Sequence, residues 1–585
     1  MIIKGKVSNF TRQMFVRQYI PAIISAIVFA IADMADALVV GNRMGTLGLA
    51  AIAFSIPVYM FFNVIMHSFG MGGSIMYARR MAEGDEEKAV KSFQGVFAVL
   101  MVISIAIAVL GNIFIDDVLF ILGAKASGDF LKEAARTYLQ LILTAAPFFF
   151  FDYSLGYYLR NDDMEKEASI CSTIGNITDF SLNIILVLFL NMGVFGAGLA
   201  TFIGVVLTSC VQFVFLLQKK SHLRFFPFRP GFFDIGKSFK TGISSCISYI
   251  YSFAFIWIGN NAMVRLAGET GVAIFDIIQN LSNLMIYIFG ALNQATQPIL
   301  STYEGECNYS ECDGMQARAG VIAAGNAIFY TALIWILAPW ICRLFGIQLN
   351  YAIAMGTFAI RIFSLCIIFV GLNMVIANYY TSRSIFVPAF ILSTLRGVAI
   401  ILPVTFICIA IGRDAFWFVY PITECVSFLI ILIYISFIMK KTKRLEPERI
   451  FTATLFNEPE KIGTVTEQID GFCEKWDANV KQQYYVQMTV EEMCSAIMAK
   501  GFSQKMPVPG EIQLTVVASD KGEFSLHIRD NATTFDPFSM EKAVVNDDED
   551  SETDFNALGM DVIKQKAKSF YYRRYQGFNT MVVKI

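Results

Sequence analysis

Two carboxylates lie inside the first long apolar stretch of the chain, where water cannot solvate their charge. Asp33 and Asp36 are three residues apart, so a helix would place them on neighbouring turns of one face. A charged side chain in an apolar setting is costly unless it is paired. Carboxylate oxygens suit Na⁺ or a proton, and they are poor ligands for soft transition metals. Both residues are therefore candidates for holding a cation.

A polar stripe with helical spacing occurs in a later apolar stretch. Asn176, Asp179 and Asn183 follow an i, i+3, i+7 pattern. Thr201 begins the next stretch, directly after a glycine-rich turn, and Asp152 stands behind four phenylalanines in the preceding one. These residues join Asp33 and Asp36 as candidates. The alternative for the asparagines and Thr201 is that they only hydrogen-bond neighbouring helices together.

The second half carries basic charges in its apolar stretches, at Arg361 and Arg396. They could meet an anionic group or neutralise a buried acid such as Glu424. We expect structural pairing, because a buried charge needs a partner.

The elements that must position these residues are membrane helices. Of 585 residues, 56% are hydrophobic and only 16% are charged, with a mean hydropathy of +0.56. Soluble proteins carry about 25% charged residues, so a lipid bilayer is the expected partner. A net charge of -2 argues against binding nucleic acid.

Apolar stretches of about 20 residues recur up to about residue 439 and predict twelve membrane spans. We place them at 15–40, 48–76, 92–115, 135–158, 168–190, 195–217, 239–265, 272–299, 317–340, 354–379, 386–411 and 415–439. Basic residues flank the first and last spans, which predicts a multi-pass protein of the inner membrane with both termini in the cytoplasm. These residues are Lys4, Lys6, Arg12, Arg17, Lys440, Lys441, Lys443 and Arg444.

Short sequences recur about 222 residues apart. Gly156-Tyr-Tyr matches Asn378-Tyr-Tyr, for example. The repeat predicts two parallel six-helix lobes, at 1–222 and 223–444, which could rock about a shared site.

A soluble domain follows the last span. We assign residues 445–456 to a linker and 457–585 to a cytoplasmic α/β domain. Strands are predicted at 511–518, 523–529 and 578–585, and helices at 460–477, 482–501 and 557–568. The fold class is thus an all-α polytopic membrane protein with a C-terminal α/β sandwich.

Residues 10–440 resemble the multidrug and toxic compound extrusion (MATE) family. The likeness rests on Ile20-Pro21, on Asp36-Ala-Leu-Val-Val-Gly41, on the segment Ala78–Ala89, and on Gly193-Val-Phe-Gly-Ala-Gly-Leu-Ala-Thr201. It implies a secondary antiporter in which Na⁺ or H⁺ enters as an organic cation or drug leaves. By this likeness Asp36 is the first-span acid, and Asp179, Asn183 and Thr201 fall on cation-site positions. The order of Asp179 and Asn183 is the reverse of the one that the family often shows.

The C-terminal domain resembles the ATP-binding domain of histidine kinases and anti-sigma-factor kinases. The likeness rests on the segments Thr489–Ala496, Asp530–Pro537 and Asn556–Ile563. It implies that Glu491 takes the position of the base, Asp530 that of the adenine-reading acid, and Gly559 a place beside phosphate. Ser495 stands where the Mg²⁺-binding asparagine is usual, and Ala532 replaces the first glycine. ATP is thus a candidate ligand, and we expect no appreciable ATPase or kinase activity.

Three functions remain open. The first is a cation-coupled exporter, not an enzyme, whose tail regulates it and could bind a cytoplasmic protein. The second is a flippase for lipid-linked precursors, for which a more basic cavity would be expected. The third is a membrane sensor that signals through its tail. The carboxylates at Asp36 and Asp179 favour the exporter.

Overall fold

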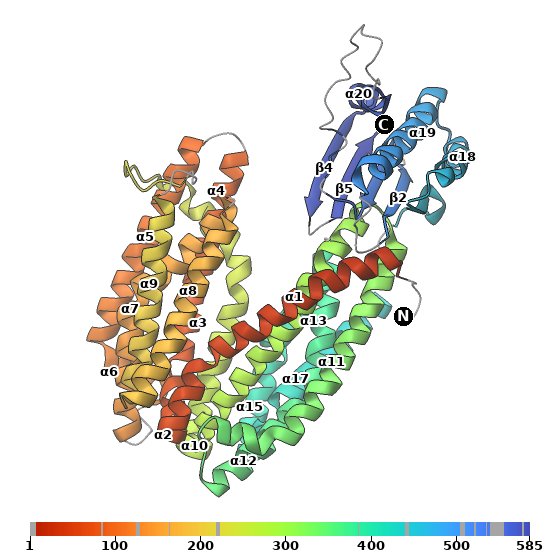
Figure 1. Cartoon of the computed structure of the whole chain (residues 1–585). Helices are drawn as coiled ribbons and strands as arrows, with labels where there is room; N and C mark the ends of the chain where they lie inside the picture. Colours follow the sequence, from red (N-terminus) through yellow and green to blue (C-terminus); the bar gives the residue numbers. More distant parts are fainter. Residues whose placement is uncertain are drawn as a thin grey trace.

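The protein consists of two helical bundles and a small domain attached to the second bundle (Figure 1). The computed structural model describes residues 7–82, 86–124, 129–162, 164–217, 223–383, 385–438, 444–502, 509–519, 522–533, 535–536, 538, 555–575 and 578–585. The bundles meet at one end and diverge towards the other, and the small domain sits at the diverging end (Figure 1). At the meeting end, Asn42 Nδ2 donates to the carbonyl of Leu344 at 2.5 Å and Trp257 Nε1 to that of Ile121 at 2.5 Å.

Helices of the first half build the first bundle. Its elements are α2 (Ala35–Ala53), α3 (Ile56–Ile65), η1 (Met66–Met71), α4 (Gly72–Ala82), α5 (Glu86–Ile113), α6 (Ile115–Leu122), α7 (Asp129–Asn161), α8 (Glu165–Asn183), η3 (Ile184–Phe189) and α9 (Gly193–Leu216).

The second bundle follows after the short turn η4 (Phe232–Asp234). Its elements are the second arm of α10 (Ile235–Gly305), α11 (Tyr309–Leu344), α12 (Asn350–Ser364), α13 (Ile367–Ser382), α14 (Phe386–Thr394), η5 (Leu395–Ala399), α15 (Ile401–Ile411), α16 (Arg413–Phe416), α17 (Val419–Ile433) and η6 (Tyr434–Ile438). The first arm of α10 packs on the first bundle instead, where the ring centroids of His67 and Tyr249 lie 4.3 Å apart and those of Phe69 and Phe239 5.2 Å.

Ten helical segments within the described residues are long and apolar enough to cross a membrane. Two of them bend sharply at a glycine with positive φ, Gly45 (φ 65°) and Gly268 (φ 61°). In α10 this bend turns the helix back on itself. The ring centroids of Phe255 and Phe275 lie 5.9 Å apart, although a straight helix would separate the two residues by about 30 Å. The predicted number of twelve spans remains a prediction.

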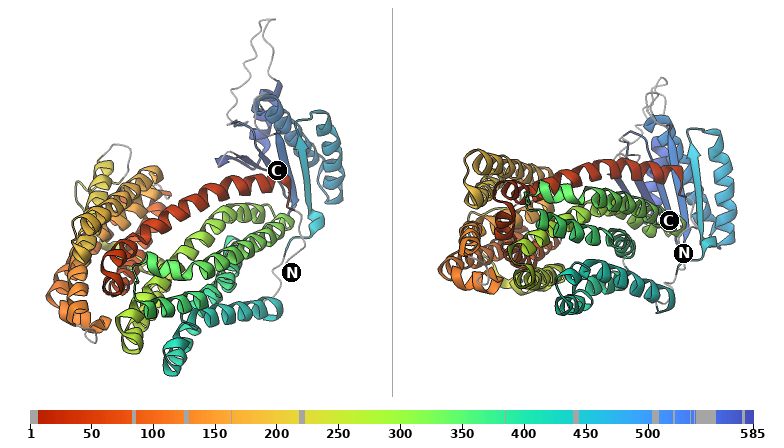
Figure 2. Two further views of the ribbon diagram at one scale, coloured as in Figure 1. Left: turned by 60° about the horizontal axis from the view of Figure 1, so that its bottom comes forward. Right: turned by 90° about the horizontal axis from the view of Figure 1, so that it is seen from below.

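The first helix, α1 (Asn9–Asp33), does not lie within the first bundle (Figures 1 and 2). It runs along the second bundle, where Asn326 of α11 donates to the hydroxyl of Tyr19 at 2.8 Å. A single turn residue, Met34, separates α1 from α2, and α2 then enters the first bundle. This differs from the predicted lobe of residues 1–222, because the apolar faces of α1 identify a buried helix but not the bundle that buries it.

The C-terminal domain, called the tail below, is a five-stranded antiparallel sheet in the order β1-β2-β3-β5-β4. Its strands are β1 (Ile450–Phe456), β2 (Glu511–Ala518), β3 (Phe524–Asp530), β4 (Ser569–Tyr575) and β5 (Phe578–Lys584). Its helices are η7 (Pro447–Arg449), α18 (Glu460–Lys475), α19 (Val480–Ala496), η8 (Ile497–Gly501) and α20 (Phe555–Lys566). Strand β1 occupies residues assigned above to the linker, and β4 was not predicted.

Candidate cation site

The carboxylate of Asp36 lies in the first turn of α2, just after the break at Met34. Three side chains donate to this carboxylate: Tyr138 Oη to Oδ2 at 2.7 Å, Asn183 Nδ2 to Oδ1 at 2.5 Å, and Thr201 Oγ1 to Oδ2 at 3.2 Å. They come from α7, α8 and α9, so one acid joins four helices.

Asp179 belongs to the same cluster. Its Oδ1 accepts from Asn183 Nδ2 at 3.1 Å. A small-residue face brings α9 against α8 here, since a Cβ at Gly204 would lie only 3.0 Å from the Cβ of Asp179. The structure therefore brings together the four predicted residues Asp36, Asp179, Asn183 and Thr201.

The electrostatics of this cluster favour a bound cation. Within the described part of the chain, no lysine or arginine forms an ion pair with Asp36 or Asp179. Asp36 and Asp179 are half-buried, and two carboxylates that share such a site repel each other unless a cation or a proton intervenes. Asn183 is fully buried, and its carbonyl Oδ1 accepts no hydrogen bond from the described residues. That oxygen can serve as a further ligand for a hard cation.

Tyr138 was not among the predicted site residues. This side chain is 1% exposed and contributes the phenolic donor on the α7 side of Asp36. Tyrosines are frequent in this chain, which has 23, so residue type alone could not single it out. The only signal in the sequence would have been the position of Tyr138 on the face of α7 that turns towards Asp36 of α2.

Other first-half candidates lie elsewhere. Asp152 accepts from Gln212 Nε2 at 2.5 Å, about 20 Å along α7 from Tyr138. The side chain of Asn176, one turn before Asp179 on α8, is exposed, so it does not join the buried cluster. The side chain of Asp33 falls outside the described part of the structure.

The two basic residues predicted in the spans of the second half have different kinds of partner. Arg396 Nε lies 2.8 Å from Glu424 Oε1, and Arg361 Nε donates to the carbonyl of Trp335 at 3.2 Å. Asp276 of α10, an acid of this half that was not predicted, is 1% exposed and accepts from Asn280 Nδ2 at 3.2 Å. Scanning span eight for carboxylates would have found it.

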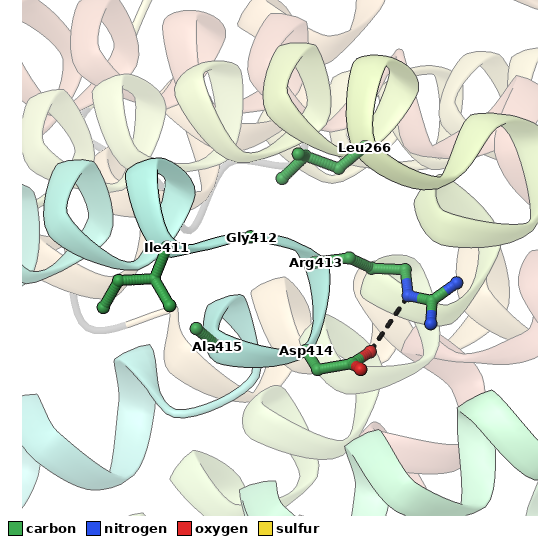
Figure 3. Close-up of a pocket in the computed structure, with 6 residues that line it drawn as sticks. All are labelled: Leu266, Ile411, Gly412, Arg413, Asp414 and Ala415. Carbon is green, nitrogen blue, oxygen red and sulfur yellow. Dashed lines mark hydrogen bonds and ion pairs between the residues drawn. The ribbon is translucent and has the colours of Figure 1, made fainter.

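A surface hollow of about 300 Å³ lies on the second bundle (Figure 3). It is lined by Leu266 and the segment Ile411–Ala415, and Arg413 Nε pairs with Asp414 Oδ1 at 2.9 Å across its edge. None of the predicted site residues lines it.

The predicted nucleotide residues of the tail are only partly assembled. Asp530 is buried and accepts from Asn579 Nδ2 at 2.7 Å and from the amide of Ala532 at 2.9 Å. Glu491 is exposed on α19, and Ser495 lies one turn beyond it.

A carboxyl group stands beside Gly559 on α20. A Cβ at this glycine would lie 2.5 Å from Oε2 of Glu492, so a carboxylate already fills the space next to it. Burial raises the pKa of Glu492, and the neighbouring Glu491 raises it further. A phosphate at this position would lie against the carboxyl group of Glu492.

A model of the family described as MatE matches residues 21–185 and 241–407, more than half of the chain. The chain belongs to the MatE family. Members of this family are secondary transporters and not enzymes. The family match thus agrees with the likeness noted from the sequence motifs, and it ends before the tail.

Relatives with given names are distant in sequence. The probable multidrug resistance protein YoeA of Bacillus subtilis is 22% identical over 210 residues, which are 35% of this chain and 45% of YoeA. The chain therefore spans less than half the length of that relative. The multidrug export protein MepA of Staphylococcus aureus is 24% identical over 404 residues, 66% of this chain and 85% of MepA.

Solved structures share the fold of the membrane part. An inward-facing MATE family transporter of the MOP superfamily superposes with a TM-score of 0.63 at 20% identity, covering 71% of this chain and 96% of that chain. The MATE multidrug transporter DinF-BH gives 0.58 at 21% identity, covering 75% of this chain and 100% of that one.

Proposed function

We propose that this MatE protein is an antiporter that exports organic cations, drugs or metabolites in exchange for Na⁺ or H⁺. The observation that carries the proposal is the shared site of Asp36 and Asp179, two carboxylates with no basic partner among the described residues. Asn183 and Thr201 complete the ligand set. An ion bound there alters the charge at the junction of α1 and α2, and coupling follows if that charge favours one arrangement of the bundles.

Alternating access of two lobes is supported by the arrangement of the helices. The same family model matches two segments, which begin at residues 21 and 241. The bundles meet at one end and diverge at the other (Figure 1). A rocking motion about the meeting end would open the site to either side of the membrane in turn.

Both termini are proposed to lie in the cytoplasm, on the evidence of the basic flanking residues. Of these residues, Arg12, Arg17 and Arg444 belong to the described part of the chain. The others lie outside the described residues: Lys4, Lys6, Lys440, Lys441 and Lys443.

The flippase alternative is less well supported. An anionic lipid-linked substrate needs free basic side chains, and Arg396 is already paired with Glu424 within the second bundle. The sensor alternative draws on the contact between the tail and the second bundle, but a tail of this kind also suits a regulated transporter.

The tail is proposed to be a degenerate ATP-binding fold with a regulatory role. The helices α18, α19 and α20 and the five-stranded sheet are compatible with that fold. Ser495 offers Mg²⁺ no amide ligand, and Glu492 beside Gly559 repels phosphate. Weak nucleotide binding without turnover, or binding of a cytoplasmic protein, would then shift the transporter between its states.

A transport assay with a matched control tests the exporter proposal. Purified protein in proteoliposomes should accumulate a fluorescent organic cation when a Na⁺ or H⁺ gradient is imposed, and Asp36→Asn should abolish this uptake. Asp152→Asn removes another membrane carboxylate of the same bundle that lies outside the cluster, and it should retain uptake. Equal activity of wild type and Asp36→Asn would refute the proposed role of Asp36.

A further inference from the structure

One face of the tail sheet is turned towards the membrane bundles. In β2 and β3, Ile512, Leu514, Leu526 and Ile528 pack into the helical core of the tail. Successive side chains of a strand point to opposite faces, so Gln513 and Arg529 point away from that core. They are cross-strand neighbours in the register of the sheet. Both are buried, and the membrane part of the chain is what covers them.

Arg529 makes a buried ion pair with Glu306, at the end of α10. The arginine is 2% exposed and the glutamate 3%. Desolvation raises the pKa of Glu306, and the Arg529 guanidinium opposes that rise. Removing one partner of such a pair leaves an uncompensated buried charge, which is strongly unfavourable. The two residues are far apart in sequence, so this pair joins the tail to the second bundle.

Tyr303 connects the same contact to α1. Its hydroxyl donates to Gln513 Oε1 at 2.8 Å and lies 2.5 Å from Thr11 Oγ1 of α1. The guanidinium of Arg529 stands 4.8 Å from the centroid of the Tyr303 ring. One tyrosine of the second bundle thus contacts both the tail and the first turns of α1.

An aromatic contact adds a direct link between α1 and the tail. The rings of Phe10 and Phe578 meet edge to face with centroids 5.2 Å apart, and Arg17 lies 5.7 Å from the Phe578 centroid. Phe578 is buried with the core of the membrane bundles rather than with the core of the tail. The start of α1 is also held by Glu311, which accepts from Thr11 Oγ1 at 2.9 Å.

We propose that these contacts form a latch, in which the tail holds α1 against the second bundle and restrains transport. The latch consists of Gln513, Arg529 and Phe578 of the tail with Phe10, Thr11, Tyr303 and Glu306. It rests on the proposed alternating access. The far end of α1 leads through Met34 to Asp36, whose carboxylate is bonded to the first bundle. Rocking of the bundles must therefore bend or displace α1, and the latch opposes this.

The latch lies next to the proposed nucleotide position. Arg529 and Asp530 are consecutive in β3, so one side chain faces the bundles while the other faces the helices of the tail. A ligand that draws on Asp530 would act on the same strand that carries the latch arginine. A ligand bound at Asp530 would therefore contact the residue next to Arg529, which holds the tail against the second bundle.

The test uses the full chain in lipid nanodiscs and in proteoliposomes. Glu306→Gln and Arg529→Gln should each speed hydrogen–deuterium exchange of the amides in residues 9–20 by about tenfold or more. Each should also raise gradient-driven uptake several-fold. The reversed pair, Glu306→Arg with Arg529→Glu, should restore slow exchange and slow uptake. Lys475→Gln is the control, because Lys475 pairs with Glu448 on the exposed side of the tail at 2.6 Å.

The outcomes separate the latch from the proposed transport function. Fast exchange in the single variants of a protein that transports no organic cation would support the latch and contradict the exporter. Unchanged exchange of residues 9–20 in both single variants would overturn the latch, and so would fast exchange with uptake that is unchanged or slower in an active transporter.

Discussion

Asn183 Nδ2 bridges the two acids of the candidate site, at 2.5 Å from Oδ1 of Asp36 and 3.1 Å from Oδ1 of Asp179. One amide therefore holds together a residue of α2 and a residue of α8. Its carbonyl oxygen is left to face a cation. The relationship explains how acids on two different helices can respond to a single bound ion.

Replacing Asn183 by alanine should weaken ion binding more than substrate binding. The variant loses the carbonyl ligand and the amide that offsets the repulsion between Asp36 and Asp179. The ion concentration that gives half-maximal uptake should rise by roughly tenfold. Substrate affinity, measured by fluorescence polarisation of a dye without an ion gradient, should change little. Parallel losses of both affinities would instead indicate misfolding.

Tyr138→Phe should act in the opposite direction. The phenol stabilises the empty, charged carboxylate of Asp36 through a 2.7 Å hydrogen bond. Without this hydrogen bond the ion-free carboxylate of Asp36 is less stable, and the coupling ion binds it more tightly. The half-saturating ion concentration should therefore fall by roughly tenfold. Initial rates of uptake across a titration of the ion measure this, and Tyr153→Phe on the same helix provides a control. A rise in the half-saturating concentration would count against the proposed geometry.

The tail should lose stability as the pH falls from 6.5 towards 4. Burial, aided by Arg529 and Lys584, lowers the pKa of His527 from 6.5 to about 4. The unfolded tail therefore takes up a proton in this range before the folded tail does, and unfolding becomes more favourable. The stability that the folded tail gains from a neutral His527 is fully present above pH 6.5. Fluorotryptophan labelling allows the resonance of Trp476 to follow unfolding of the tail in the full chain, and His527→Gln should reduce the pH dependence. An unaltered pH dependence in His527→Gln would assign the acid sensitivity to other groups.

The full chain should release no phosphate from ATP above background. Ser495 and the acid beside Gly559 leave Mg²⁺ and phosphate without their usual ligands. Any binding of a fluorescent ATP analogue should be lost in Asp530→Ala, because that carboxylate is the feature retained for adenine. Robust turnover, or phosphorylation of another protein, would contradict this view of the tail.

The candidate site was predictable because charged residues are rare inside apolar helices. Asp36 and Asp179 are charges in apolar helices, and helical spacing puts Asp179 and Asn183 on one face. The strands β2, β3 and β5 were equally clear, since apolar and polar residues alternate within them.

The missed features depend on contacts between distant residues. The break of α1 at Met34 carries no glycine or proline, so no local signal marks it. The pair of Glu306 and Arg529 joins two domains, and each residue alone resembles an ordinary surface charge. Strand β1 lies at a sheet edge and is only partly buried, which makes its alternation weak.

The central claim is that Asp36 couples the ion flux to the flux of the organic cation. The most direct test uses a gradient of the organic cation to drive the ion. An outwardly or inwardly directed gradient of an organic cation is imposed across proteoliposomes, and the opposing flux of Na⁺ or H⁺ is recorded with radioactive sodium or a trapped pH dye. We predict an ion flux that the wild type and Asp152→Asn sustain and that Asp36→Asn abolishes. A substrate-driven ion flux of equal size in Asp36→Asn would contradict the account.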